Sequence, residues 1–230
     1  IGSQSIRFGN PNRAVAIGFV AGYNLNGNDT IAIGAYAHWR NSSSGSVAIG
    51  FGSLDSNSAD NNTAVGYQSA NSNTSGGYIT AIGYQALKSN TTGVENTALG
   101  TLALNQNTTG SANTAIGSAS LQNHTTGDYN VSIGDASMTN NLTGVKNTAI
   151  GGFSMYSSTG SKNTVIGYNA QTGAYDSSVV LGFDATATAS NQFVVGSAGT
   201  NAGTVVVGAN VSSQYWNVII NGTAYKILLA

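Results

Sequence analysis

A glycine that follows a branched aliphatic residue returns at short, regular intervals along most of this chain. The interval between successive marker glycines, as we call them, is 16 four times, 17 five times, and then 16, 15 and 14. Such regularity indicates a repeat protein in which each repeat is one structural unit. The marker glycines are Gly2, Gly18, Gly34, Gly50, Gly66, Gly83, Gly100, Gly117, Gly134, Gly151, Gly167, Gly182 and Gly196.

The three residues before each marker glycine have separate characters. The residue two positions before it is usually Ala, and we call these positions the alanine row. The residue three positions before it is Val, Ile or Thr in most repeats. The residue directly before it belongs to what we call the branched row, which includes Ile17, Ile33, Ile49, Ile82, Leu99, Ile116, Ile133, Ile150 and Ile166.

A period between 14 and 17 is too short for a pair of helices. β-Branched residues, glycines and Asn-Thr-Thr-Gly turns, as at 90–93 and 107–110, favour short strands. We therefore predict an all-β parallel solenoid, with two short strands and two turns per coil. The marker glycine forms one corner, where a side chain would be crowded. Coils stack ~4.8 Å apart, so thirteen of them form a rod roughly 60 Å long.

The strand pattern also predicts an oligomer. Neighbouring residues of a strand point to opposite faces, so the alanine row occupies one face and the branched row the other. Both faces are small or apolar in repeat after repeat. A thin roll has one interior, and an uncovered apolar stripe of this length exceeds what soluble monomers expose. We expect further copies of the chain to cover the second face. The branched row then serves core or interchain packing.

The repeat resembles the head repeats of trimeric autotransporter adhesins of the YadA type. The long form at Ile79–Gly93, ITAIGYQALKSNTTG, is more similar to the version found in bacteriophage fibres, except for Ile79 where other copies have Asn. The resemblance covers residues 1–198. It implies a left-handed parallel β-roll and a homotrimer with the three chains side by side.

The last part of the chain, residues 199–230, departs from the repeat. Residues Tyr215–Ile220 and Thr223–Leu229 read as two strands joined at Asn221-Gly222, which suits a hairpin turn. We expect this hairpin to cap the open edge of the last coil. It resembles the C-terminal ends of phage fibre proteins, and we expect a virion attachment region upstream of residue 1.

The residue types needed for most kinds of site are scarce. Cys is absent, which excludes disulfides and thiolate chemistry. The seven basic residues are scattered and the net charge is -1, so we expect no nucleic-acid partner. No apolar run is long enough for a membrane helix. We expect no cofactor, no transition metal and no catalysis, although an oxygen-ligated Ca²⁺ at an Asn or Asp turn remains an alternative.

Two acidic pairs are candidates for a glycan-cleaving site: Asp128 with Asp135, and Asp55 with Asp60. Neither pair recurs in other repeats, so solvated turn residues are the favoured interpretation. His124 occupies the place that Asn holds in other turns, which favours a turn variant over a catalytic residue.

Aromatic residues are the best candidates for ligand contact. Six of them directly follow a marker glycine, where they either stack on sugars or fill corners and chain contacts. Departures from the repeat gather around Trp39 and in the C-terminal segment, so Tyr215, Trp216 and Trp39 are the candidate residues for contact with a surface glycan.

The leading interpretation is a non-catalytic phage fibre segment on the virion that recognises a bacterial surface glycan or outer-membrane receptor. A bacterial adhesin head at the cell surface is the main alternative. Two further alternatives are a glycan depolymerase and an ice-binding solenoid, the latter because Thr91-Thr92, Thr108-Thr109 and Thr125-Thr126 form a ladder. Ice binders favour Thr on a flat strand face, whereas these pairs lie in predicted turns.

Overall fold

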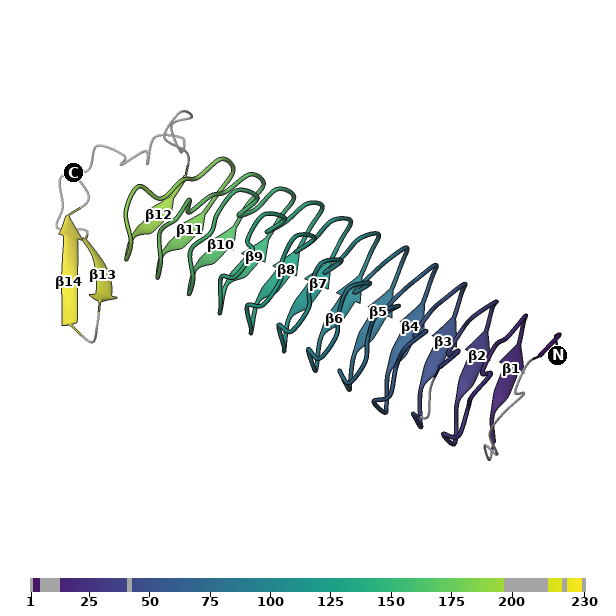
Figure 1. Cartoon of the computed structure of the whole chain (residues 1–230). Helices are drawn as coiled ribbons and strands as arrows, with labels where there is room; N and C mark the ends of the chain where they lie inside the picture. The colour runs from purple at the N-terminus through teal and green to yellow at the C-terminus, as the bar shows by residue number, and fades with distance from the viewer. Residues whose placement is uncertain (1, 5–12, 41–42, 197–214, 221–222, 229–230) are drawn as a thin grey trace.

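The structure, a computed structural model, is a parallel β-solenoid followed by a separate hairpin (Figure 1). It describes residues 2–4, 13–40, 43–196, 215–220 and 223–228, with the side chains of the residues up to 196. Twelve three-residue strands form one parallel sheet in sequence order, which confirms the predicted fold class. The strands are β1 Val15–Ile17, β2 Ile31–Ile33, β3 Val47–Ile49, β4 Thr63–Val65, β5 Thr80–Ile82, β6 Thr97–Leu99, β7 Thr114–Ile116, β8 Val131–Ile133, β9 Thr148–Ile150, β10 Thr164–Ile166, β11 Val179–Leu181 and β12 Phe193–Val195.

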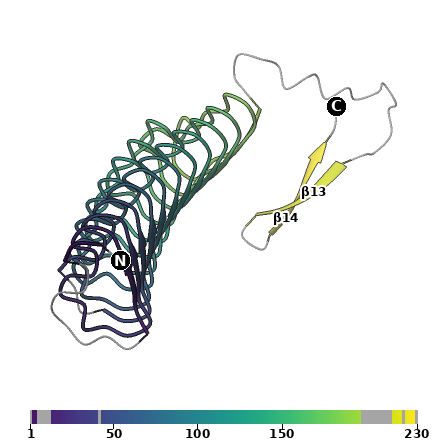
Figure 2. The same cartoon turned by 90° about the vertical axis from the view of Figure 1, so that its right-hand side faces the viewer.

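Each strand pairs with the next without any shift of register. Between β6 and β7, for example, Ala98 lies opposite Ala115 and Leu99 lies opposite Ile116. Equivalent residues of all the coils therefore form straight rows along the rod, and the coils follow one another with a similar outline (Figure 2). At ~4.8 Å per strand, the twelve strands span roughly 55 Å.

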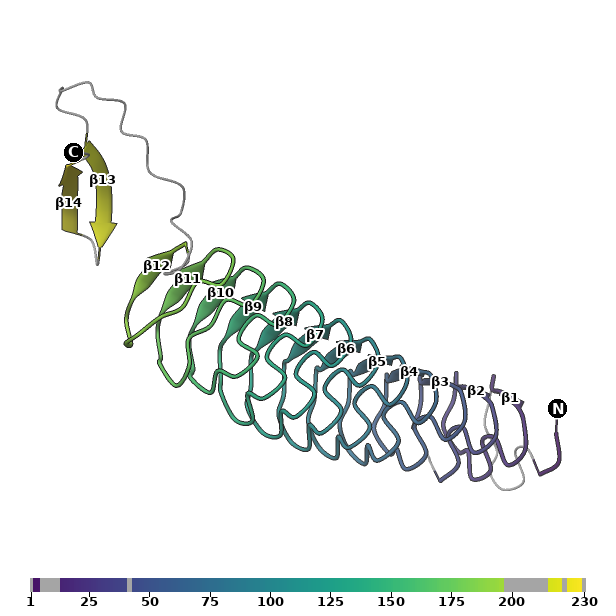
Figure 3. The ribbon, with the colours of Figure 1, turned by 90° about the horizontal axis from the view of Figure 1, so that it is seen from above.

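Each coil contains one strand, not the two that the sequence led us to expect. The strands lie along one side of the coil and the turns along the other (Figure 3). On the turn side, alternate residues such as Gln85 and Leu87 have φ angles of 53° and 51°. Left-handed residues at every second position do not form a strand. Their amides still bond between coils, as where Leu87 N–H donates to the Ala103 carbonyl at 2.9 Å.

The marker glycines are required by the close contact between successive coils. Gly151 has a φ of 129°, and a Cβ placed on it would lie 2.6 Å from the carbonyl oxygen of Gly167. The other marker glycines from Gly2 to Gly167 face the backbone of the following coil in the same way. The prediction that a side chain crowds this corner is confirmed.

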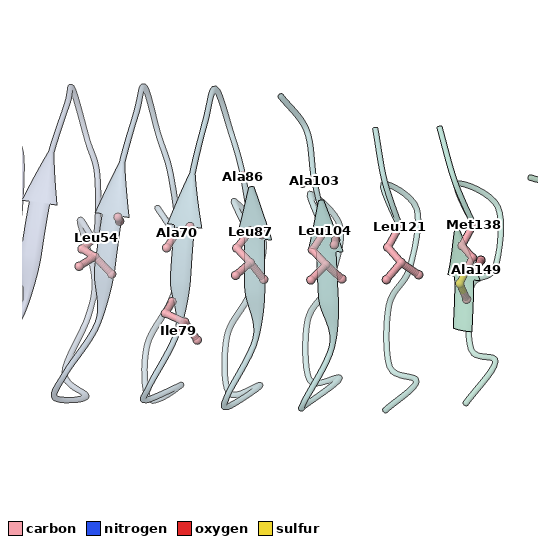
Figure 4. Close-up of a cluster of buried hydrophobic side chains, with 14 of the residues drawn as sticks. Leu54, Ala70, Ile79, Ala86, Leu87, Ala103, Leu104, Leu121, Met138 and Ala149 are labelled. Carbon is pink, nitrogen blue, oxygen red and sulfur yellow. The ribbon is translucent and has the colours of Figure 1, made fainter. Parts of the chain in front are cut away.

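The interior of the coil is filled mainly by the alanine row and by one row of larger residues. Leu54, Leu87, Leu104, Leu121 and Met138 are fully buried and follow one another along the rod (Figure 4). Most alanines of the alanine row are also fully buried. The branched row lies on the outer side of the strands, where Leu99 remains 44% exposed. Within the single chain, the branched row is therefore not the core.

Two rows of buried asparagines complete the interior. In the turn ladder (Asn57, Asn73, Asn90, Asn107 and Asn141), each side chain lies in the turn after the row of large residues. Asn90 Nδ2 donates both to Asn73 Oδ1 at 2.7 Å in the preceding coil and to the carbonyl of Gly93 at 2.9 Å in its own. The pre-strand ladder (Asn62, Asn96, Asn113, Asn130, Asn147 and Asn163) bonds between coils in a similar way, as where Asn113 N–H donates to Asn96 Oδ1 at 3.0 Å.

His124 interrupts the turn ladder. Its Nδ1 lies 2.6 Å from the carbonyl oxygen of Asn141, and its Nε2 lies 2.8 Å from that of Gly127. Both neighbours accept hydrogen bonds, whereas a neutral imidazole carries only one N–H. In addition, the ring offers no donor to Asn107 Oδ1, which is buried without a hydrogen-bond partner. His124 is thus the turn variant that the sequence predicted, at a cost in hydrogen bonding.

The adjacent glycines Gly151 and Gly152 provide a matched test of the coil contact. Gly151→Ala should lower the free energy of unfolding by about 3 kcal/mol, because the new Cβ meets backbone of the next coil and the φ is left-handed. Gly152→Ala should change it by less than about 1 kcal/mol, since the nearest atoms belong to the Tyr168 ring, 3.3 Å away. Chemical denaturation measures both, and equal losses would contradict the assigned role of the marker glycines.

Restoring the turn ladder should stabilise the rod. His124→Asn should raise the free energy of unfolding by about 1 kcal/mol, because an amide donates to Asn107 Oδ1 and removes an unpaired buried acceptor. The reverse change at an intact position, Asn90→His, should lower it by a similar amount. A loss of stability in His124→Asn would show that the imidazole is the better partner in this turn.

Candidate functional site

The outer strand face is the most extensive candidate surface. It consists of the branched row and the row two residues before it, which point away from the interior in every strand. In the branched row, Ile17, Leu99 and Ile166 are 42%, 44% and 43% exposed. The companion row changes from Val and Ile in β1 to β3 to Thr in β4 to β7. Because the strands are in register, this surface is a straight, largely apolar stripe along the whole rod.

An aromatic row follows the marker glycines at the adjoining corner. Phe51, Tyr67 and Tyr84 stack in consecutive coils, with ring centroids 5.4 and 5.5 Å apart and interplanar angles of 12° and 9°. Neighbouring rings therefore cover part of each other's faces. Stacking on a sugar needs a free ring face. The arrangement instead favours the corner-filling and chain-contact interpretation for these three rings.

The aromatic row is interrupted and then resumes. Thr101, Ser118, Asp135 and Gly152 occupy the equivalent positions of the next four coils. A second group follows, in which Tyr168 stacks on Phe183 at 5.7 Å and meets Phe153 edge-on at 5.7 Å. The corner thus alternates between aromatic and polar stretches along the rod.

The Trp39 cluster, formed by Phe19, Tyr36, Trp39, Arg40 and Phe51, breaks this regular geometry. Tyr36 stands at its centre and meets three rings edge-on, with Trp39 the nearest at 5.4 Å. The guanidinium of Arg40 lies over the Trp39 ring, 4.2 Å from its centroid. Such a cation–π contact holds an exposed cation beside an aromatic surface. The structure therefore brings Trp39, one of the three candidate residues, into a mixed aromatic and cationic patch.

Asp55 of the next coil adds an acidic neighbour to this patch. Burial raises the pKa of its carboxyl, and the nearby charge of Arg40 opposes that shift. Its Oδ1 is buried without a hydrogen-bond partner. Asp60, the predicted companion of Asp55, is engaged elsewhere, because its Oδ1 accepts a hydrogen bond from Ser44 N–H at 2.6 Å.

The other two candidate residues belong to the C-terminal hairpin. Strands β13 (Tyr215–Ile220) and β14 (Thr223–Leu228) pair antiparallel, with Trp216 opposite Ile227. This agrees with the two strands predicted from the sequence, while the turn at 221–222 and the side chains of Tyr215 and Trp216 lie outside the described residues. The proposed contact of these side chains with a glycan, and the capping role of the hairpin, stay predictions.

Several of the remaining acids have structural partners. Asp128 Oδ1 accepts a hydrogen bond from Ser111 N–H at 2.7 Å, and Asp176 Oδ1 accepts one from Ser161 N–H at 2.6 Å. Serine plays the same part at this position in other coils, as where Ser111 Oγ accepts from Val94 N–H at 3.1 Å. Asp135 stands at the far end of β8 from Asp128. One member of each predicted acidic pair, Asp60 and Asp128, therefore has a structural role in connecting coils.

The structure also bears on three other interpretations of the sequence: a metal site, an ice-binding ladder and a membrane helix. Within residues 2–4, 13–40 and 43–196, no three His, Asp or Glu side chains gather where they might hold a metal ion. In the turns, Thr91 Oγ1 donates to the carbonyl of Thr108 at 2.9 Å, and Thr108 Oγ1 donates to that of Thr125 at 3.1 Å. These hydroxyls connect the coils, which weakens the ice-binding interpretation of this ladder. The described part of the chain contains no helix long and apolar enough to cross a membrane.

Together, the fold and its surface define a repetitive parallel β-solenoid with a continuous apolar outer strand face. Comparison with protein-family models, with curated proteins and with solved structures gives no match. The functional interpretation therefore depends on the geometry of this chain itself and on the resemblance of its repeats.

Proposed function

We propose that the chain is a non-catalytic structural segment of a trimeric phage fibre that recognises a bacterial surface. The observation that carries the proposal is the outer strand face, a straight apolar stripe that every coil repeats. The coils are held together by their own backbone bonds, asparagine ladders and buried rows. The regularity of the stripe is thus not needed to hold one chain together, and it suits an interface with chains of the same shape.

The dimensions of the stripe support side-by-side assembly. It runs along all twelve strands, about 55 Å, and is lined by Ile, Leu, Val and Thr. A contiguous apolar patch of more than a few hundred Å² on a soluble protein marks an interaction surface. Because every coil has the same spacing, parallel copies match one another coil by coil. The number of chains, three, comes from the resemblance to YadA-type heads and phage fibres.

Recognition is assigned to positions where the chain departs from its own repeat. Rows of residues that are fixed by packing are similar in every coil and cannot provide specificity for a particular ligand. The Trp39 cluster and the hairpin residues Tyr215 and Trp216 are departures of this kind. A surface polysaccharide offers hydroxyls for polar groups such as Arg40 and C–H faces for aromatic rings. The fibre would present these residues at the virion surface.

Assembly can be separated from folding with two neighbouring residues. Ile116→Asp places a charge on the outer strand face, so we expect it to dissociate the assembly and leave the coil folded. Ala115→Asp buries the same charge inside the coil, so we expect it to prevent folding. Sedimentation equilibrium should give three times the chain mass of 23.2 kDa for the unchanged protein. A soluble, folded monomer with the original sequence would refute the proposed interface.

Recognition can be tested by host-cell binding. Trp216→Ala and Trp39→Ala trimers, each first shown to keep its oligomeric state, are compared with the unchanged trimer. We expect Trp216→Ala to lose most binding, and Trp39→Ala to do so if the ligand lies at the first coils instead. The same incubations with purified surface polysaccharide should release no fragments. Unchanged binding by both variants would show that these aromatic residues do not contact the ligand.

Electron microscopy with an antibody against the chain tests where the protein is located. Labelling of a bacterial envelope in place of a phage particle would favour the adhesin head.

A further inference from the structure

Two rows of variable residues border the outer strand face, one along each of its long sides. The row that directly follows the marker glycines, which includes the aromatic row, forms what we call the glycine corner. The residues five positions before the marker glycines form what we call the leading corner. From β1 to β10 these are Arg13, Asp29, Gly45, Asn61, Tyr78, Glu95, Ala112, Tyr129, Lys146 and Lys162. Because both rows vary from coil to coil, packing within the chain does not determine them.

Charges of opposite sign lie on the two corners of adjacent coils. Asp135 is the single acid of the glycine corner, and Lys146 lies on the leading corner of the next coil. Both side chains are exposed. Among the described residues, the ion pair within the chain joins Arg13 to Asp29 and leaves Asp135 and Lys146 outside it. These two charges are therefore available to a partner.

The two charges cannot meet each other within one chain. Asp135 lies just beyond the end of β8, and Lys146 lies just before the start of β9. These strands pair in parallel and in register, so the two residues stand at opposite ends of the strand face. The three residues of β8 alone span roughly 10 Å. An ion pair between them must be formed by two different chains.

Parallel assembly brings unlike corners together. When identical rods run parallel and turn the same face towards a common axis, rotation places one corner of each face beside the other corner of its neighbour. A closed ring allows no cumulative shift along the axis, so equal coils meet at equal heights. In an antiparallel pair, by contrast, each corner would meet its own copy.

We propose that Asp135 forms an ion pair with Lys146 of the neighbouring chain and so joins the glycine corner to the leading corner. This inference rests on the proposed function, which supplies the parallel assembly. Asp135 then lies at a height between Tyr129 and Lys146 of the neighbour, because these residues precede and follow it along the coils. A phenol and an ammonium group both donate hydrogen bonds to a carboxylate.

The same arrangement gives compatible neighbours at other heights. Glu95, an acid of the leading corner, falls between Tyr84 and Thr101 of the neighbour's glycine corner, and both hydroxyls can donate to it. Gly152 falls between Lys146 and Lys162 and has no side chain to compete for that space. Neither Asp135 nor Glu95 is placed beside another acid. The match at separate coils supports the pairing of unlike corners.

The ion pair would determine the direction of the chains more than their affinity. The branched row is similar from coil to coil, so the apolar stripe offers much the same surface to a parallel and to an antiparallel copy. Single exposed ion pairs contribute little to stability. In a trimer, however, three equal pairs form together, and all three are lost when a chain is reversed.

Crosslinking between chains tests which corners meet, and the absence of Cys removes any background. Full-length Asp135→Cys and Lys146→Cys chains are co-expressed, and the trimer is treated with a short bifunctional maleimide. We expect covalent dimers on a denaturing gel, since each chain carries a single thiol. Asp135→Cys alone, Lys146→Cys alone, and Asp135→Cys with the turn-side Gln122→Cys should give no dimers.

Charge exchange tests the ion pair itself. Asp135→Lys and Lys146→Asp each bring like charges together at three contacts, so each should raise the dissociation constant of the trimer by roughly 3- to 100-fold. The double variant restores opposite charges and should return to within about threefold of the unchanged protein. Sedimentation at low protein concentration measures all four proteins. A double variant as weak as the sum of its single changes would overturn the ion pair.

Failure of the ion pair and failure of the proposed function give different results. A trimer in which Asp135→Cys and Lys146→Cys chains do not crosslink overturns the ion pair and leaves the trimeric fibre standing. Crosslinking of Asp135→Cys chains to one another shows that like corners meet and also overturns the pair. A soluble, folded monomer refutes the trimeric assembly and the ion pair together.

Discussion

The contact between successive marker glycines is the constraint on which the rest of the molecule depends. Each lies against the backbone of the following coil, so the strands stack in register and every later row of residues is straight. The alanine row fits the narrow interior that this stacking leaves, and the branched row is forced to the outside. Ladders of backbone bonds then connect equivalent residues from coil to coil. The outer strand face thus depends on a contact made at the corner that directly follows it.

The interior is unusual in its polarity. Two asparagine ladders run through it, and with few exceptions their amides find donors or acceptors in the next coil. Buried amides of this kind penalise a shift of register, because any displacement leaves them unpaired. Apolar rows alone would tolerate slippage, since Leu54 and Leu87 are alike. The asparagines therefore define which coil positions meet, while the apolar rows supply the burial.

Much of this architecture could be predicted from the sequence, because a repeated contact leaves a repeated residue. The strand positions, the crowded glycine corner, the opposite faces of the alanine and branched rows and the two C-terminal strands all agree with the structure. The prediction of a second strand in each coil was wrong, because residues such as Leu87 and Met138 on the turn side of the coil adopt a left-handed φ. Only the surrounding coils impose that conformation, and no residue type signals it.

The candidate sites were less predictable for the same reason. Trp39 stood out as a departure from the repeat, but its contacts with Tyr36 and Arg40 depend on how side chains from different coils meet. The hydrogen-bond partners of the acids could not be predicted either. Asp128 and Ser111, for example, are distant in the sequence and become neighbours only because successive coils stack.

The shrinking repeat length has a consequence for how such a rod evolves. Between Gly66 and Gly151 all the repeats have the same length, so a copy gained or lost by recombination changes the rod by one coil and leaves the cross-section intact. Towards Gly196 each repeat is one position shorter than the repeat before it, and those coils are no longer interchangeable. Length can therefore vary within the uniform stretch alone. The shorter coils are not interchangeable in this way, so the length of the rod and the form of its last coils can change independently.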